Sequence, residues 1–129
     1  MDDRPLILIA DDHPTNRKVL EIMLAKVARL IIVENGQEAV EAARAEALDV
    51  ILMDMQMPVM DGIRATRQIR EDEVADKRPR VPIVMLTAHS LEDDIEMGRE
   101  AGADSHMTKP VSMTQLHEAI ETIIGARAE

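Results

Sequence analysis

Residues 49–62 have the sequence "DVILMDMQMPVMDG", in which a short apolar run ends on a carboxylate. The run from Val50 to Met53 has the length and composition of a strand covered on both faces, as in a parallel sheet. Asp54 follows it directly. A buried strand that ends on a charged residue presents that charge at the carboxyl edge of the sheet, where functional groups of open α/β folds collect.

Similar apolar runs recur along the chain, each followed by helical periodicity. They are Leu6 to Ala10, Leu30 to Val33, Ile83 to Leu86 and a weaker run from Ser105 to Thr108. Two helical stripes are clear: Val19, Leu20, Met23, Leu24 and Val27 form one, and Leu116, Ile120, Ile123 and Ile124 form the other. Five strands alternating with five helices predict an α/β fold with a doubly wound parallel sheet.

Local signals mark the ends of these helices. Three pairs predict helix N-termini: Asn35 with Glu38, Ser90 with Asp93, and Ser112 with Gln115. Gly102 is expected to end the fourth helix. The segment 71–82, "EDEVADKRPRVP", is highly charged and contains two prolines, so it is predicted to be a solvated loop before the fourth strand.

Length and composition limit the class of protein. The chain has 129 residues, which fits one domain, and its formal charge of -10 disfavours nucleic acid and anionic membranes as partners. It has no apolar run long enough to span a membrane and no secretory signal, so a cytosolic protein is expected. The absence of Cys excludes disulfides and thiolate metal sites.

The predicted strands end on polar residues with complementary chemistry. These are Asp11 and Asp12 after the first strand, Asp54 after the third, Thr87 after the fourth, and Lys109 followed by Pro110 after the fifth. Alone, each residue type is common at a strand end, in a turn or on a solvated edge. Together they predict one functional site at the carboxyl edge of the sheet.

This set of charges implies a cation. Two carboxylates about 4 Å apart repel by roughly 4 kcal/mol at an effective dielectric of about 20, and one Lys cannot neutralise three of them. Oxygen ligands favour Mg²⁺ over Zn²⁺, because Cys is absent and the four His are scattered. Beside Mg²⁺, Asp54 can act as a nucleophile on a phosphoryl group, with Lys109 and Thr87 contacting the phosphoryl oxygens.

These motifs resemble the receiver domain of two-component response regulators. The matching segments are "DDHPTNR" after the first strand, "MDMQMPVMDG" around Asp54, "VPIVMLTA" for the fourth strand and "KP" after the fifth. The resemblance covers essentially the whole chain, as one receiver domain over 1–129 with a core at about 5–125. It implies a flavodoxin-like strand order 2-1-3-4-5.

The resemblance also implies roles for single residues. Asp54 would be the phosphoacceptor. Direct ligands of Mg²⁺, or of Mn²⁺ in its place, would be Asp12, Asp54 and the backbone carbonyl of Gln56, with Asp11 holding the metal through a water molecule. Thr87 would be the switch hydroxyl, and Lys109 its ion-pair partner after a cis peptide to Pro110.

The chain departs from the family pattern at one position, and the roles of the residues at two further positions stay open. His106 stands where the family usually has an aromatic switch ring; it is either an ordinary half-exposed strand residue or a switch that adds pH sensitivity. Gln56 and His89 occupy positions that tune phosphoryl lifetime in the family, or they are merely exposed at the rim.

The expected function is therefore that of a signalling domain, not an enzyme. It would take a phosphoryl group from a sensor histidine kinase or a histidine phosphotransfer protein and switch the surface of the fourth helix, fifth strand and fifth helix toward a downstream protein. The wording of the motifs resembles receivers of hybrid histidine kinases, although a stand-alone regulator stays open. The alternatives are a phosphatase of the haloacid dehalogenase type, disfavoured by Gln56, and a docking module without phosphorylation.

Overall fold

The computed structural model describes residues 3–88 and 91–128, with side chains described as far as residue 125. The strands are β1 (Leu6–Ala10), β2 (Arg29–Val33), β3 (Val50–Asp54), β4 (Ile83–Thr87) and β5 (Ser105–Thr108). They form one sheet in the order β2-β1-β3-β4-β5, and every neighbouring pair is parallel. This confirms the predicted doubly wound fold and its strand order.

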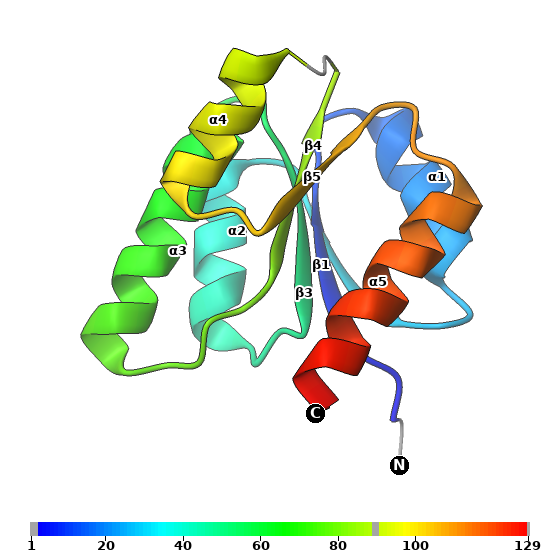
Figure 1. The fold of residues 1–129 in the computed structure, drawn as a ribbon, viewed down its shortest axis with the longest axis horizontal. Helices are drawn as coiled ribbons and strands as arrows, with labels where there is room; N and C mark the ends of the chain where they lie inside the picture. Colours follow the sequence, from blue (N-terminus) through cyan, green and yellow to red (C-terminus); the bar gives the residue numbers. More distant parts are fainter. Residues whose placement is uncertain (1–2, 89–90, 129) are drawn as a thin grey trace.

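Helices cover both faces of the sheet. They are α1 (Pro14–Leu24), α2 (Gly36–Ala45), α3 (Gly62–Asp76), α4 (Glu92–Ala101) and α5 (Met113–Ala128). Figure 1 shows α2, α3 and α4 on one side of the sheet and α1 and α5 on the other. No helix of the described residues is both long enough and apolar enough to cross a membrane.

Side chains alternate along the strands between two apolar cores. In β1, Leu8 packs in the core under α2, α3 and α4, whereas Ile7 and Ile9 pack in the core under α1 and α5. All three are fully buried. Because both faces of the central strands are covered, their sequences are continuously apolar.

Two of the predicted helix caps are present. The side chain of Asn35 accepts a hydrogen bond from Glu38 N at 2.8 Å, and the Ser112 hydroxyl accepts one from Gln115 N at 3.0 Å. Ser90 lies outside the described residues; α4 has Leu91 at its N-cap position and no side-chain cap. Gly102 ends α4 as predicted, with a φ of 116° that glycine adopts at little cost.

The prediction of a loop over 71–82 was wrong in its first half. The helix α3 runs to Asp76 and ends at Lys77, which has a left-handed φ of 54°. Glu71, Glu73 and Ala75 are good helix formers, and Pro79 excludes a helix only beyond the observed end at Lys77. The first apolar stripe is also narrower than predicted: Val19 and Val27 are more than 40% exposed, while Leu20 and Leu24 are buried.

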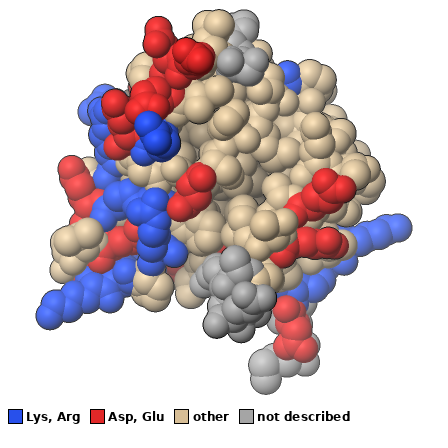
Figure 2. Space-filling model, viewed as in Figure 1, with Lys and Arg blue, Asp and Glu red and all other residues tan. Residues whose placement is uncertain are grey.

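Charges are unevenly distributed on the face seen in Figure 2. Lys and Arg interleave with Asp and Glu on the side of α3 and α4, while the centre of the face, in front of β5, is mostly uncharged. The edge strand β5 is itself exposed at Ser105, His106 and Thr108. An uncharged, exposed edge between two helices leaves room for a protein contact.

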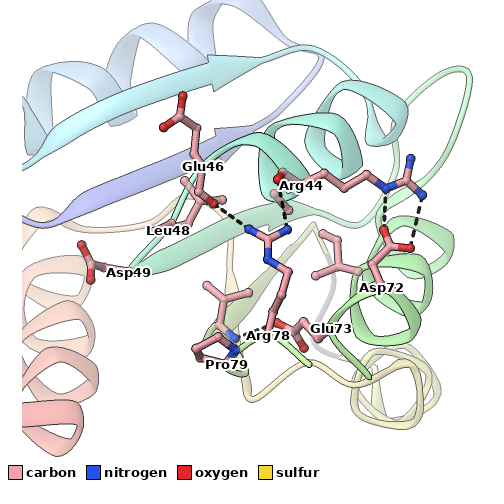
Figure 3. A pocket seen from close by; sticks show the side chains of 12 residues that line it. Arg44, Glu46, Leu48, Asp49, Asp72, Glu73, Arg78 and Pro79 are labelled. Atoms are coloured by element: carbon pink, nitrogen blue, oxygen red, sulfur yellow. Dashed lines mark hydrogen bonds and ion pairs between the residues drawn. The ribbon is translucent and has the colours of Figure 1, made fainter. Parts of the chain in front are cut away.

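A cavity of about 210 Å³ lies at the amino edge of the sheet, between the C-terminal ends of α2 and α3 (Figure 3). Its arginines already have partners. Arg44 pairs with Asp72 at 2.8 Å, and Arg78 donates to the carbonyl oxygens of Arg44 and Glu46. This edge is opposite to the strand ends that carry the predicted site.

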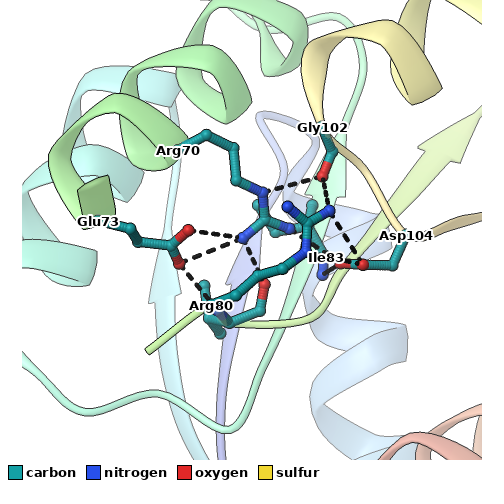
Figure 4. Close-up of polar contacts among 7 residues, drawn as sticks. Arg70, Glu73, Arg80, Ile83, Gly102 and Asp104 are labelled. Carbon is teal, nitrogen blue, oxygen red and sulfur yellow. Dashed lines mark hydrogen bonds and ion pairs between the residues drawn. The ribbon is translucent and has the colours of Figure 1, made fainter. Parts of the chain in front are cut away.

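A buried arginine joins α3 to the end of α4 (Figure 4). The guanidinium of Arg70 donates to the carbonyl oxygens of Gly102 at 2.9 Å and Val81 at 2.7 Å. It also pairs with Glu73 and Asp104, each at 2.9 Å, and its side chain is 12% exposed. The C-terminal end of α4 is therefore anchored to α3.

Replacing Arg70 with Ala is expected to lower the free energy of unfolding by about 1–3 kcal/mol, because the mostly buried Glu73 loses its ion-pair partner and the carbonyl oxygen of Val81 loses its donor. Urea unfolding measures this. Arg67→Ala, an exposed position on the same helix, is the control and should change stability by less than about 0.5 kcal/mol. Equal effects of the two substitutions would contradict the anchoring role.

Candidate functional site

The ends of β1, β3 and β5 bring carboxylates and one ammonium together. Asp11 follows β1 and is 0% exposed, and Asp54 ends β3 and is 4% exposed. The Lys109 ammonium lies 3.1 Å from Asp54 Oδ1 and 3.4 Å from Asp11 Oδ2. Asp12 is half-buried beside them. The four charged residues predicted to converge do so.

The turn after β3 is built so that Asp54 stays at the sheet edge. Met55 N donates to the carbonyl of Leu86, and Gly62 N donates to the carbonyl of Met55, both at 2.9 Å. A β-carbon at Gly62 would overlap the carbonyl oxygen of Asp54, so only glycine allows α3 to start so close. Between them Val59 has a φ of 68°, a costly conformation for a β-branched residue.

Burial raises the pKa of Asp54 above its ordinary value. The attraction of Lys109 opposes this rise, and the negative charge of Asp11 adds to it. Gln56 N also donates to Asp54 Oδ1, at 3.4 Å. Asp54 is therefore a buried carboxylate whose charged form is only partly compensated by the protein.

The site is suited to a divalent cation. Asp54 Oδ2 is buried and receives no hydrogen bond from the described residues. Two further buried oxygens have only ion-pair contacts within that part of the chain: Asp11 Oδ2 with Lys109 and Asp12 Oδ1 with His13. One ligand atom from each of Asp11, Asp12, His13 and Asp54 lies within 4.8 Å of the others. Three carboxylates in this arrangement fit a hard ion such as Mg²⁺.

A pocket of about 80 Å³ opens above Asp54. The residues that line it are His13, Asp54, Met55, Gln56, Thr87, Ala88, Asp94 and Lys109. Thr87 is buried, whereas Gln56 is exposed. The predicted acceptor, hydroxyl and ammonium thus share one pocket. The peptide between Lys109 and Pro110 is cis, as the resemblance implied.

His106 lies outside this pocket. It lines a neighbouring one of about 100 Å³, which it shares with Thr87, Met85 and Asp94. The residue is exposed on β5. His89 lies outside the described residues. Met55, Thr87 and Asp94 border both pockets.

The sequence interpretation missed two residues of the site. His13 directly follows Asp11 and Asp12, and its Nδ1 lies 3.0 Å from Asp12 Oδ1. A histidine beside two aspartates was a visible signal for a metal ligand. Asp94 lines both pockets from the first turn of α4. Only the packing of α4 reveals it, because acidic residues at helix starts are common.

The chain belongs to the response regulator receiver domain family, whose model matches residues 7–121. The sensor protein GacS of Pseudomonas syringae pv. syringae is 39% identical over 117 residues, which are 90% of this chain and 13% of GacS. The chain therefore spans a small part of that relative. Protein PilH of Pseudomonas aeruginosa is 37% identical over 120 residues, which are 92% of this chain and 97% of PilH.

Solved structures agree with this family. The receiver domain of sensor histidine kinase PA1611 from Pseudomonas aeruginosa PAO1, with magnesium coordinated in its active-site cleft, has a TM-score of 0.86 and 38% identity, covering 95% of this chain and 98% of that one. The Saccharomyces cerevisiae receiver domain of Ssk1, solved with the histidine phosphotransfer protein Ypd1, has a TM-score of 0.93 and 31% identity, covering 98% and 92%.

Asp54→Asn is expected to stabilise the protein at pH 7 without divalent ions. Since the pKa of Asp54 is raised, the folded state binds more protons than the unfolded state, and stability is lost as the pH rises through that pKa. Asn has no charge to bury and avoids this loss, so we expect a gain of about 0.5–2 kcal/mol in urea unfolding with a chelator.

The control is Asp76→Asn, at an exposed position on α3, which should leave stability nearly unchanged. The gain at position 54 should also shrink on acidification toward the ordinary pKa of aspartate, because wild-type Asp54 is then protonated. A loss of stability in Asp54→Asn at pH 7 would contradict the account of a buried carboxylate whose charge is only partly compensated.

Proposed function

We propose that Asp54 accepts a phosphoryl group from a phosphohistidine on a sensor histidine kinase or a histidine phosphotransfer protein. One observation carries this proposal. Asp54 Oδ2 is buried, free of hydrogen bonds from the described residues and set in a pocket with an ammonium 3.1 Å from its sister oxygen. Such a carboxylate can act as a nucleophile on a phosphoryl group, and the neighbouring ammonium can offset the negative charge of the phosphoryl oxygens.

In the proposed step a carboxylate oxygen of Asp54 attacks the phosphorus atom. The bond between phosphorus and the donor imidazole nitrogen breaks, its electron pair returns to that nitrogen, and an aspartyl phosphate remains. Lys109 offsets the charge on the phosphoryl oxygens, and the Thr87 hydroxyl lies within the same pocket to contact one of them. Asp54 itself must be ionised.

Asp11, Asp12 and Asp54 would hold Mg²⁺, or Mn²⁺ in its place, with the backbone carbonyl of Gln56 as a further ligand and Asp11 bound through water. When bound, the ion supplies positive charge to the phosphoryl oxygens. The buried oxygens of the three carboxylates support this assignment, as does the magnesium in the PA1611 receiver domain.

We place the phosphodonor surface on α1, beside the mouth of the pocket. Val19 and Ile22 are 43% and 65% exposed. Val19 also lines a groove of about 140 Å³ with Pro110 and Val111, next to Lys109. The Ssk1 receiver domain was solved with a histidine phosphotransfer protein, and an apolar groove beside the acceptor would suit such a partner here.

The output is proposed to be a protein contact made by α4, β5 and α5. A phosphoryl group adds a charge of about -1.5 to -2 at pH 7. Thr87 borders both pockets, so its movement toward the phosphoryl group would open space near His106.

We propose that the domain, with a core over about 5–125, carries out only its own phosphorylation and dephosphorylation. Its cytosolic location stays a prediction.

Phosphatase activity of the haloacid dehalogenase type remains the less favoured function. That chemistry needs an acid two residues after the nucleophile. Gln56 stands there, and its amide has no proton to give at neutral pH. A docking module without phosphorylation would not need a buried and partly compensated Asp54.

Incubation with acetyl phosphate and Mg²⁺ should add the mass of one phosphoryl group to the wild-type chain. Asp54→Asn should show no adduct, since its amide is not a nucleophile, and the exposed control Asp76→Asn should behave as wild type. Intact mass spectrometry measures all three. Equal labelling of Asp54→Asn and wild type would contradict the assignment of the acceptor.

The ring signals of His106 are expected to shift in NMR spectra when beryllofluoride, a phosphoryl mimic, is added with Mg²⁺. In Thr87→Ala the mimic should still bind, but the shift of the ring should largely vanish because the coupling hydroxyl is missing. An unchanged His106 ring in the wild-type protein would remove it from the proposed switch.

A further inference from the structure

His13 is turned toward the carboxylates. It occupies the N-cap position of α1, and its side chain makes no capping hydrogen bond. Its backbone N donates to Asp11 Oδ1 at 2.9 Å, while its ring Nδ1 lies 3.0 Å from Asp12 Oδ1 and 3.5 Å from Asp11 Oδ1. The ring is 64% exposed, so burial does not force this orientation.

The spacing of the four groups suits a coordination sphere. An ion with bonds of about 2.1 Å holds adjacent ligand atoms about 3.0 Å apart and opposite ones about 4.2 Å apart. Nδ1 of His13 and Oδ1 of Asp12 have the adjacent spacing, and the ligand atoms of all four residues lie within 4.8 Å of one another.

A second observation points to a ligand at this place. Asp54 is only 4% exposed, and its buried Oδ2 receives no hydrogen bond from the described residues. Asp11 is fully buried, and its Oδ2 has an ion-pair contact with Lys109 at 3.4 Å but no hydrogen bond from the part of the chain that the structure describes. The cluster is thus more than a patch of exposed acids.

The added nitrogen changes which ions the site prefers. Mg²⁺ takes oxygen ligands and keeps much of its hydration, whereas imidazole is a good ligand for later divalent ions of the first transition row. Even a site with oxygen ligands alone binds such ions more tightly than Mg²⁺. A nitrogen ligand is therefore revealed by how much the preference for such an ion over Mg²⁺ falls when His13 is replaced.

We propose that His13 Nδ1 is a direct metal ligand and shifts the site toward imidazole-accepting divalent ions such as Co²⁺. The proposal rests on the metal site of the proposed function and adds a fourth residue to it. Mg²⁺ still binds through the three carboxylates. In the competing arrangement, His13 is a charged partner of Asp12 and never contacts the ion.

Calorimetric titrations of the whole chain with CoCl₂ and with MgCl₂ distinguish the two. His13→Asn should weaken Co²⁺ binding by roughly tenfold or more, as expected for the loss of a ligand, and Mg²⁺ binding by less than about threefold. His117→Asn removes another histidine, which is half-buried on α5 and lies outside the cluster, and should change neither. Unchanged Co²⁺ binding in His13→Asn, or an equal loss for both ions, overturns the proposal.

Pulsed electron paramagnetic resonance of bound Cu²⁺, an ion that accepts imidazole ligands, provides a readout of the bond itself. Wild type should show coupling to a ¹⁴N nucleus, and His13→Asn should lose it; absence of coupling in wild type overturns the proposal. The phosphoryl adduct is measured separately. If the wild-type chain forms the phosphoryl adduct but shows no nitrogen coupling, only the role of His13 is contradicted. If it shows nitrogen coupling but forms no adduct, only the phosphoacceptor function is contradicted.

Discussion

The contact of one ammonium with two buried carboxylates organises this molecule. Lys109 reaches Asp54 at 3.1 Å and Asp11 at 3.4 Å from the end of the edge strand. Without it, two carboxylates about 4 Å apart would repel by roughly 4 kcal/mol. One Lys leaves the acidic cluster with a net negative charge. This remaining charge favours the binding of a cation, and the ionised Asp54 can attack an electrophile.

The fold supports this arrangement from both sides of the sheet. The apolar strands β1, β3 and β4 are covered by helices, so the residues at their ends have little freedom to move apart. Gly62 lets α3 start against the carbonyl of Asp54. By contrast, α4 is anchored at its C-terminal end by Arg70 and lacks a side-chain cap at Leu91. The C-terminal end of α4 is therefore fixed to α3.

The centre of the sheet could be predicted because β1, β3 and β4 are continuously apolar up to a polar residue at or just after the strand end. The site residues at strand ends followed from the topology, since parallel strands bring their carboxyl ends together. The extent of α3 could not, because a segment as highly charged as 71–76 suits an exposed helix as well as a loop. Tertiary contacts decide between the two, because Arg70 and Glu73 bind the backbone of Val81 in the segment before β4.

Side-chain direction was harder to predict than position. The sequence places His13 beside two aspartates, but only the structure turns its ring toward them. For His106, the strand position was predicted, and the structure adds that it borders a pocket shared with Thr87. Asp94 reaches the site through the packing of a helix far from it in sequence. The positions of His106 and Asp94 beside Thr87 depend on tertiary contacts that no local pattern encodes, whereas His13 contacts its sequence neighbours.

The central claim is that Asp54, among the clustered carboxylates, carries the phosphoryl group. Reduction of the phosphorylated chain with borohydride converts an acyl phosphate to an alcohol, so peptide sequencing by mass spectrometry identifies the modified aspartate as homoserine. The account predicts homoserine at position 54 alone. Homoserine at position 11 or 12, with Asp54 unmodified, would contradict it.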